Sequence, residues 1–132
     1  MKVGELRIGN IIEVNHFEYG NMFAKVTSIN DCGDLCLYLL DDRFTSEEYE
    51  CTMNEVCAIP LIHEQLLRCG FDEPCDGVYE HNEYNIELTH DYDNKWWVSW
   101  NGGEDFWFSI ENLHQLQNAC QVITGNELKI EL

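Results

Sequence analysis

The sequence predicts an α+β fold, with a β-rich half at residues 1–61 and a half made of helix, meander and helix at residues 62–132. Apolar residues recur at steps of three and four near residues 63–69 and 113–124, which is typical of amphipathic helices. Short apolar runs separated by polar turns fill most of the rest, which is typical of antiparallel strands. The length of 132 residues and the apolar fraction of 45% suit one compact domain with a real core.

The first half is predicted to be all β. We expect strands at residues 10–14, 22–29 and 35–40 and a short one near 49–53, because apolar and polar side chains alternate there. The turn NDCGD at residues 30–34 joins two of them. Strands this short favour a small, strongly bent barrel, and an SH3-like module is plausible by analogy of strand lengths alone.

The second half is predicted to open with a helix at residues 63–69, with Leu66 and Leu67 pointing inward and Gly70 as a left-handed cap. Phe71 should then pack back on this helix. After a turn-rich stretch at residues 72–77, four apolar runs (GVYEH, YNIEL, KWWVSW and DFWFSI) indicate a four-stranded antiparallel meander.

Pleat alternation divides the aromatic residues of the meander between two faces. Trp96, Val98 and Trp100 fall on one face with the other large apolar residues, and we expect the C-terminal helix to cover it. Trp97 and Trp107 fall on the opposite, otherwise polar face. That face is predicted either to dock on the first half of the chain or to contact a partner.

The C-terminal segment, residues 113–132, is predicted to be a helix followed by a short strand. Leu113, Leu116, Cys120 and Ile123 form one apolar stripe, and Gly125 ends the helix. The segment LKIEL at residues 128–132 is the predicted strand.

Three blocks of the sequence resemble a family of small proteins from Bacteroidetes and their phages: LRIGN at residues 6–10, IPLIHEQLLRCGF at 59–71, and LHQLQNACQVITGNEL at 113–128. The family shows LRIGN, PIPLTEE..LLK.GF and VHQLQNLYFALTGEEL in the same order. Ile62 stands where the family has a helix-capping Thr, which removes a side-chain acceptor at the helix start. The resemblance implies kinship and a bacterial or phage origin, and it brings no activity, cofactor or catalytic residue.

The charge of the chain is strongly one-sided, since 25 acidic and 7 basic residues give a formal net charge of -18. Such a surface repels phosphate, so we expect no direct binding to nucleic acid or to anionic membranes. No apolar run approaches the roughly 18 residues that span a bilayer, and the start has no signal-peptide pattern. We therefore expect a cytoplasmic protein, and the charge favours a protein partner with a basic surface; the oligomeric state is left open.

The sequence contains no recognisable catalytic or metal-binding motif. The seven cysteines form no C-x2-C pair, so we expect neither structural zinc nor another cofactor, and reduced thiols rather than disulfides. The five histidines lie in separate elements, without a nucleophile elbow or a phosphate-binding loop nearby. These observations favour a non-catalytic protein.

The densest acidic run, residues 41–55, is the main candidate for a binding surface. A solvated strand edge is the simpler interpretation. The alternative is an array of carboxylates presented to a basic groove, as in nucleic-acid mimics, with two aromatic anchors. The candidate residues in this run are Asp41, Asp42, Phe44, Glu47, Glu48, Tyr49 and Glu50.

Three functions remain open from the sequence. The first is an accessory protein that binds another macromolecule without catalysis. The second is an acidic mimic that inhibits a host or defence enzyme by occupying its nucleic-acid groove. The third is a small-molecule binder or enzyme whose site lies between the two halves.

Overall fold

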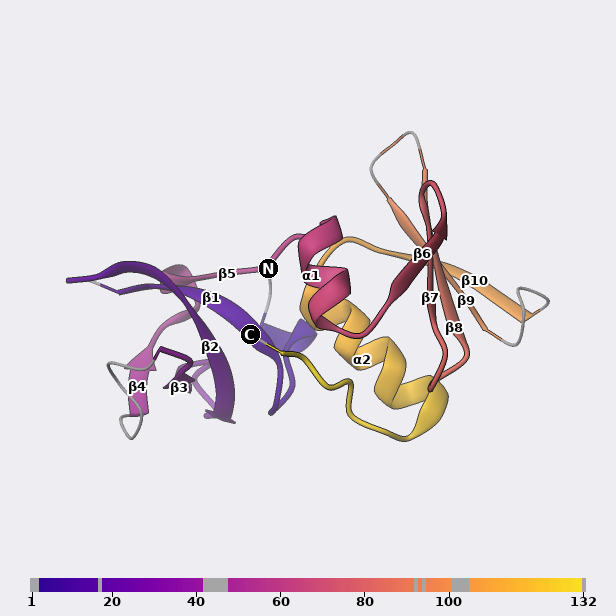
Figure 1. The fold of residues 1–132 in the computed structure, drawn as a ribbon. Helices are drawn as coiled ribbons and strands as arrows, with labels where there is room; N and C mark the ends of the chain where they lie inside the picture. Colours follow the sequence, from indigo (N-terminus) through magenta and orange to yellow (C-terminus); the bar gives the residue numbers. More distant parts are fainter. Residues whose placement is uncertain are drawn as a thin grey trace. The chain divides into compact units, whose positions relative to one another are not determined.

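The computed structural model describes residues 3–16, 18–41, 48–91, 93, 95–100 and 105–131 (Figure 1). The chain forms two compact units, Met1–Ile59 and Pro60–Leu132, so the division falls two residues before the predicted boundary of the halves. Each unit contains one five-stranded antiparallel sheet, which confirms the α+β class. That the two units make a single domain stays a prediction.

The strand order in the sheet of the first unit is β4-β3-β2-β1-β5. Strands β1 to β4 form an antiparallel meander, and β5 returns to pair with β1. Side chains alternate along β2 as predicted, and the structure shows that Met22, Ala24 and Val26 are the buried set. A 3-10 helix, Met53–Glu55, precedes the last strand. The strands are β1 (Ile11–His16), β2 (Gly20–Ile29), β3 (Leu35–Leu39), β4 (Glu48–Cys51) and β5 (Val56–Cys57).

The predicted barrel needs correction. Within the described residues, β4 and β5 are the two edges of an open sheet, and no pairing closes it. The strand β5 was not predicted, because two residues are too short to show an alternating pattern. It pairs with β1 through Glu13 and Val14.

The sheet of the second unit has five strands in the order β10-β9-β8-β7-β6, not the predicted four. The extra strand is β6 (Asp72–Cys75), which the sequence suggested was a turn. All four of its residues are exposed, and Pro74 is tolerated because β6 is an edge strand. The other strands are β7 (Val78–His81), β8 (Ile86–His90), β9 (Trp96–Trp100) and β10 (Asp105–Ile110).

The first helix of this unit, α1 (His63–Arg68), begins at Ile62 without a side-chain cap, as expected. It ends in a Schellman motif, in which the Phe71 N–H donates to the Leu66 carbonyl at 3.1 Å and Gly70 adopts a φ of 88°. Leu66 and Phe71 are fully buried, whereas Leu67 is 49% exposed. The prediction that both leucines point inward was therefore wrong, because neighbouring residues on a short helix lie about 100° apart.

The second helix, α2 (Leu113–Thr124), follows the predicted stripe. Leu113, Leu116 and Cys120 are fully buried, the Asn112 side chain accepts the Gln115 N–H, and Gly125 ends the helix at a φ of 73°. Figure 1 shows α1 and α2 on the same side of the sheet. None of the helices in the described ranges combines the length and the apolar composition required to span a membrane.

The predicted strand at residues 128–132 does not form in its described part, residues 128–131. Leu128 is buried, but the Glu131 N–H donates to the Arg68 carbonyl at 2.9 Å. Its partner is thus the end of a helix and not a strand edge, so no ladder can extend.

Strand register confirms the predicted division into two faces for β8 and β9. Ile86 lies opposite Trp100 and Leu88 opposite Val98, so these residues share one face. Trp96 is buried on that face, while Trp97 points to the other and is half-buried.

Candidate functional site

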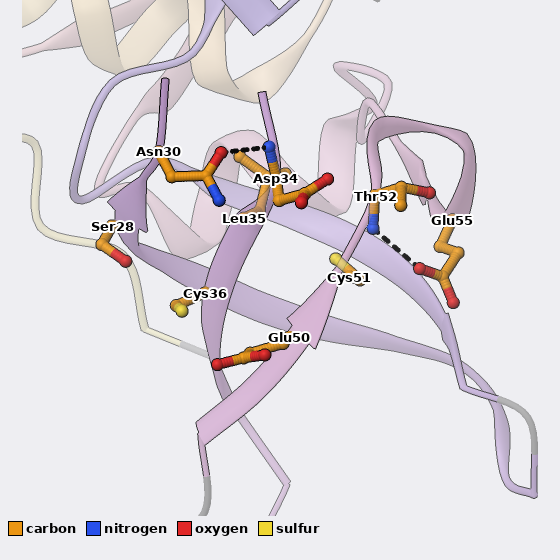
Figure 2. A pocket seen from close by; sticks show the side chains of 9 residues that line it. All are labelled: Ser28, Asn30, Asp34, Leu35, Cys36, Glu50, Cys51, Thr52 and Glu55. Carbon is orange, nitrogen blue, oxygen red and sulfur yellow. Dashed lines mark hydrogen bonds between the residues drawn. The ribbon is translucent and has the colours of Figure 1, made fainter. Parts of the chain in front are cut away.

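The first unit has a hollow of about 300 Å³ at the end of its sheet, between the β2–β3 turn and the segment that follows β4 (Figure 2). Three carboxylates line it, and none of its lining residues is a Lys or Arg. We call this hollow the acidic groove. It is lined by Ser28, Asn30, Asp34, Leu35, Cys36, Glu50, Cys51, Thr52 and Glu55.

The turn before β3 places Asp34 at the groove. The Asn30 side-chain oxygen accepts the backbone N–H groups of Cys32 and Asp34, each at 2.9 Å. The Asn30 N–H in turn donates to the Asp34 carbonyl at 3.0 Å. Because Asn side chains hold tight turns in this way, the NDCGD sequence fixes the backbone of Asp34 beside β3.

The other two carboxylates come from β4 and the 3-10 helix after it. Glu50 lies opposite Cys36 in the β3–β4 register and is exposed. The Glu55 carboxylate accepts the Thr52 N–H at 2.8 Å, which holds the side chain back toward the groove, as Figure 2 shows. A local motif therefore orients Glu55, and the sheet register orients Glu50.

The Cys51 thiol of the groove is a poor nucleophile. Burial, together with the nearby Glu55 carboxylate, raises the pKa of Cys51 to about 11. A thiol with so high a pKa stays neutral at physiological pH and reacts slowly. The carboxylates of the groove offer hydrogen-bond acceptors and negative charge, which suit a cation.

The structure places some of the predicted acidic residues near this groove. Glu50 lines it, Glu48 is exposed on the same strand, and Asp41 is half-buried. Tyr49 is half-buried and packs against the core, with its ring centroid 5.2 Å from that of His16. Its side chain therefore stabilises the first unit. The predicted residues Asp42, Phe44 and Glu47 lie outside the described part of the chain.

Sequence reasoning missed Asp34, and it included Glu55 only as the last member of the acidic run at residues 41–55. The signals were present, since Asn30 precedes an Asp-Cys-Gly-Asp turn and Thr52 precedes Glu55 at capping-box spacing. Neither signal shows that the two carboxylates line one hollow.

Trp97, one of the two tryptophans of the predicted aromatic surface, is hydrogen-bonded to Asp91. Its indole N–H donates to the Asp91 carboxylate at 2.6 Å, and the other oxygen of Asp91 accepts the N–H groups of Asp93 and Lys95. The hydrogen bond from Trp97 lowers the pKa of Asp91. Trp97 thus helps to close the β8–β9 turn. Trp107 belongs to β10, and its side chain lies outside the described part.

No described set of three His, Cys, Asp or Glu side chains is arranged to hold a metal ion. All seven cysteines are free; Cys51, Cys69 and Cys120 are buried. The predicted site between the two halves stays a prediction. No protein-family model, curated protein or solved structure matches this chain.

Proposed function

We propose that this protein is a non-catalytic, cytoplasmic accessory protein that binds a basic surface of another protein through the acidic groove. The observation that carries the proposal is the convergence of Asp34, Glu50 and Glu55 on one hollow with no basic lining residue. The formal net charge of -18 adds a long-range field that draws basic partners toward the molecule.

The size and chemistry of the groove support a single basic side chain as its occupant. A hollow of about 300 Å³ is at the small end of ligand pockets, which span roughly 300–1,000 Å³. Ammonium and guanidinium groups donate several hydrogen bonds, and bonds to carboxylates are about twice as strong as those between neutral groups.

A charge-matched pair of variants tests the groove. One variant carries Asp34→Asn, Glu50→Gln and Glu55→Gln; the control carries Glu18→Gln, Glu80→Gln and Glu111→Gln, which are exposed acids outside the groove. Gln at position 55 can still accept the Thr52 N–H. Binding of a fluorescent oligo-arginine peptide is measured by anisotropy at two salt concentrations.

We expect the groove variant to lose about tenfold or more in affinity, and the control to lose far less. Higher salt should weaken binding to the wild-type protein, because exposed charges are screened. Equal losses in the two variants would mean that only the total charge matters, and the groove proposal would then be wrong.

The acidic-mimic hypothesis is a narrower form of this proposal, in which the basic surface of the partner normally holds nucleic acid. Duplex DNA or RNA should then compete with this protein for the partner. Binding of both at once would exclude mimicry while leaving the groove in place.

Two finer features of the protein belong to the same proposal. The return of β5 beside β1 after a 3-10 helix supports an SH3-like character for the first unit, which bears on fold and not on function. The three sequence blocks at residues 6–10, 59–71 and 113–128 support an origin in a Bacteroidetes bacterium or its phage.

A further inference from the structure

Residues 127–131 of the second unit form neither helix nor strand, and individual contacts hold them against the rest of that unit. The Tyr84 hydroxyl donates to the Glu127 carbonyl at 3.2 Å, and the Glu131 N–H donates to the Arg68 carbonyl at 2.9 Å. Between these two points the Leu128 side chain is buried. We call residues 127–131 the C-terminal clasp and these contacts its anchors.

His81 on β7 supports both hydrogen-bonded anchors. Its ring stacks on Tyr84 with ring centroids 4.4 Å apart, and its Nε2 lies 3.1 Å from the Cys69 carbonyl oxygen. Cys69 is the residue after Arg68, and Phe71 meets the His81 ring edge-on at 5.0 Å. His81 therefore contacts one anchor residue directly and lies beside the other through its chain neighbour.

The hydrogen bond to Cys69 determines which nitrogen of His81 carries the proton. A carbonyl oxygen only accepts, so the proton of the neutral ring is on Nε2 and Nδ1 is an acceptor. Nδ1 is buried and has no hydrogen-bond partner. Protonation of the ring would place a second N–H at Nδ1, where no acceptor receives it and water has little access. The packed arrangement thus suits the neutral ring and not the charged one.

The charges around His81 do not reverse this preference. Burial lowers the pKa of His81 below 6.5, and the bond to Cys69 and the carboxylates of Glu83 and Asp72 oppose that shift only in part. Cys69 and Tyr84 are uncharged at neutral pH, because burial raises the pKa of both. The charged residues that act on the ring or line the hollows beside it are Arg68, Asp72, Glu80, Glu83, Glu87, Lys129 and Glu131.

The clasp can open without unfolding the sheet. Its residues belong to no helix or strand, so their release breaks no ladder and no helical turn. Leu128 alone among them is buried, and segments held by few buried apolar contacts open at a lower cost than the whole domain. Local release therefore relieves a charged His81 at a smaller cost than global unfolding.

We propose that His81 is an acid-sensitive latch, whose protonation releases the C-terminal clasp from Tyr84 and Arg68 while the sheet and α2 stay folded. Release lets the ring reach water, which hydrates the new Nδ1–H, and it uncovers Leu128 and the end of α1. In the closed state the pKa of His81 is lowered, and in the open state it returns toward 6.5. The open state therefore gains population as the pH falls below 6.5.

This inference does not rest on the proposed function. The clasp and His81 belong to the second unit, whereas the acidic groove belongs to the first. Either proposal can fail without the other.

The test is nitrogen-15 relaxation of the full chain, measured in steps from about pH 7.5 to about pH 5. The backbone order parameter of Glu131 should fall from about 0.85 to below about 0.6, the values of rigid and flexible backbone. The midpoint should lie below pH 6.5 and coincide with the titration of the His81 ring signals. Leu116 of α2 should keep its order parameter throughout.

Three variants separate the latch from general effects of acid. His81→Gln keeps a side-chain N–H for the Cys69 carbonyl but does not titrate, so its clasp should stay ordered over the whole pH range. His90→Gln is the matched control, because His90 is an exposed histidine of the same unit that lines neither hollow beside His81, and it should respond like the wild type. Tyr84→Phe keeps the stacked ring and removes one anchor, so its clasp should open at a higher pH. This last variant tests the latch even if His81→Gln does not fold.

Several results would overturn the proposal. One is a clasp that stays ordered in the wild type after the His81 ring has titrated. A pH response that persists in His81→Gln, or an unchanged midpoint in Tyr84→Phe, would also do so. Loss of order at Leu116 together with Glu131 would mean that the unit unfolds as a whole and that no latch exists.

Discussion

Replacing Trp96 with Ala should remove one of the largest buried side chains of the second unit. Trp96 is 5% exposed, so nearly the whole indole is lost from the core, at a cost of about 3–5 kcal/mol. The Leu61 carbonyl also loses its indole donor, which adds about 1 kcal/mol. The sum, about 4–6 kcal/mol, is comparable with the roughly 5–15 kcal/mol that keeps a whole domain folded. Trp96→Phe keeps an aromatic ring and should cost much less than Ala.

Urea unfolding followed by far-ultraviolet circular dichroism measures these losses without depending on tryptophan fluorescence. Trp97→Ala is the matched control, because Trp97 is the neighbouring residue, is half-buried and points to the other face of β9. Trp100 shares the face of Trp96 but is half-buried, so its replacement should fall between the two. Equal losses of unfolding free energy for Trp96→Ala and Trp97→Ala would refute the assignment of the two sheet faces.

Further predictions follow from burial, backbone conformation and protonation. Leu66→Ala should cost about 2–5 kcal/mol and Leu67→Ala less than about 0.5 kcal/mol in the same urea assay, because only Leu66 is buried; similar values would contradict the helix orientation. Gly70→Ala should destabilise more than Gly20→Ala, since both have positive φ but a Cβ at Gly70 would lie 3.0 Å from His81 Nε2, whereas the space around Gly20 is open. Burial lowers the pKa of His81 from 6.5, so its neutral form adds stability above pH 6.5 that is lost as the pH falls below that value. The stability difference between wild type and His81→Gln should therefore shrink on acidification, and a constant difference would count against a buried neutral ring. Iodoacetamide should label the exposed Cys32, Cys57 and Cys75 long before Cys69 and Cys120, whose pKa burial raises to about 12; mass spectrometry of the labelled peptides gives the order.

Regular alternation along the chain predicted most of the strands and the buried stripe of α2. The alternation predicted for β2 separates the buried Met22, Ala24 and Val26 from their neighbours, and the predicted stripe of Leu113, Leu116 and Cys120 faces the core of the second unit. These predictions succeeded because the direction of a side chain follows from backbone geometry within one element. The helix ends were also predictable from local sequence. Gly70 and Gly125 adopt a positive φ, which ends a helix and which glycine tolerates without a neighbour's help.

The errors share a different cause. Strand β5 has two residues, and strand β6 has four exposed ones including Pro74, so neither carries an apolar pattern. Each is a strand only because a neighbour offers an edge to pair with. Conversely, residues 128–131 have an alternating pattern but meet the end of α1 and form no ladder. Pairing partners are distant in sequence, so local propensity is a weak guide to them.

The sequence by itself determined the α+β class, the acidic character of the surface and most of the buried faces, because composition and periodicity are properties of single segments. Only the tertiary structure decided which polar groups meet. A turn, a strand register and a 3-10 helix bring Asp34, Glu50 and Glu55 to one hollow, and the pairing of β6 with β7 beside α1 brings Tyr79 and Glu73 to His63. Convergence of this kind depends on the register of pairing between segments, and no spacing along the chain encodes it.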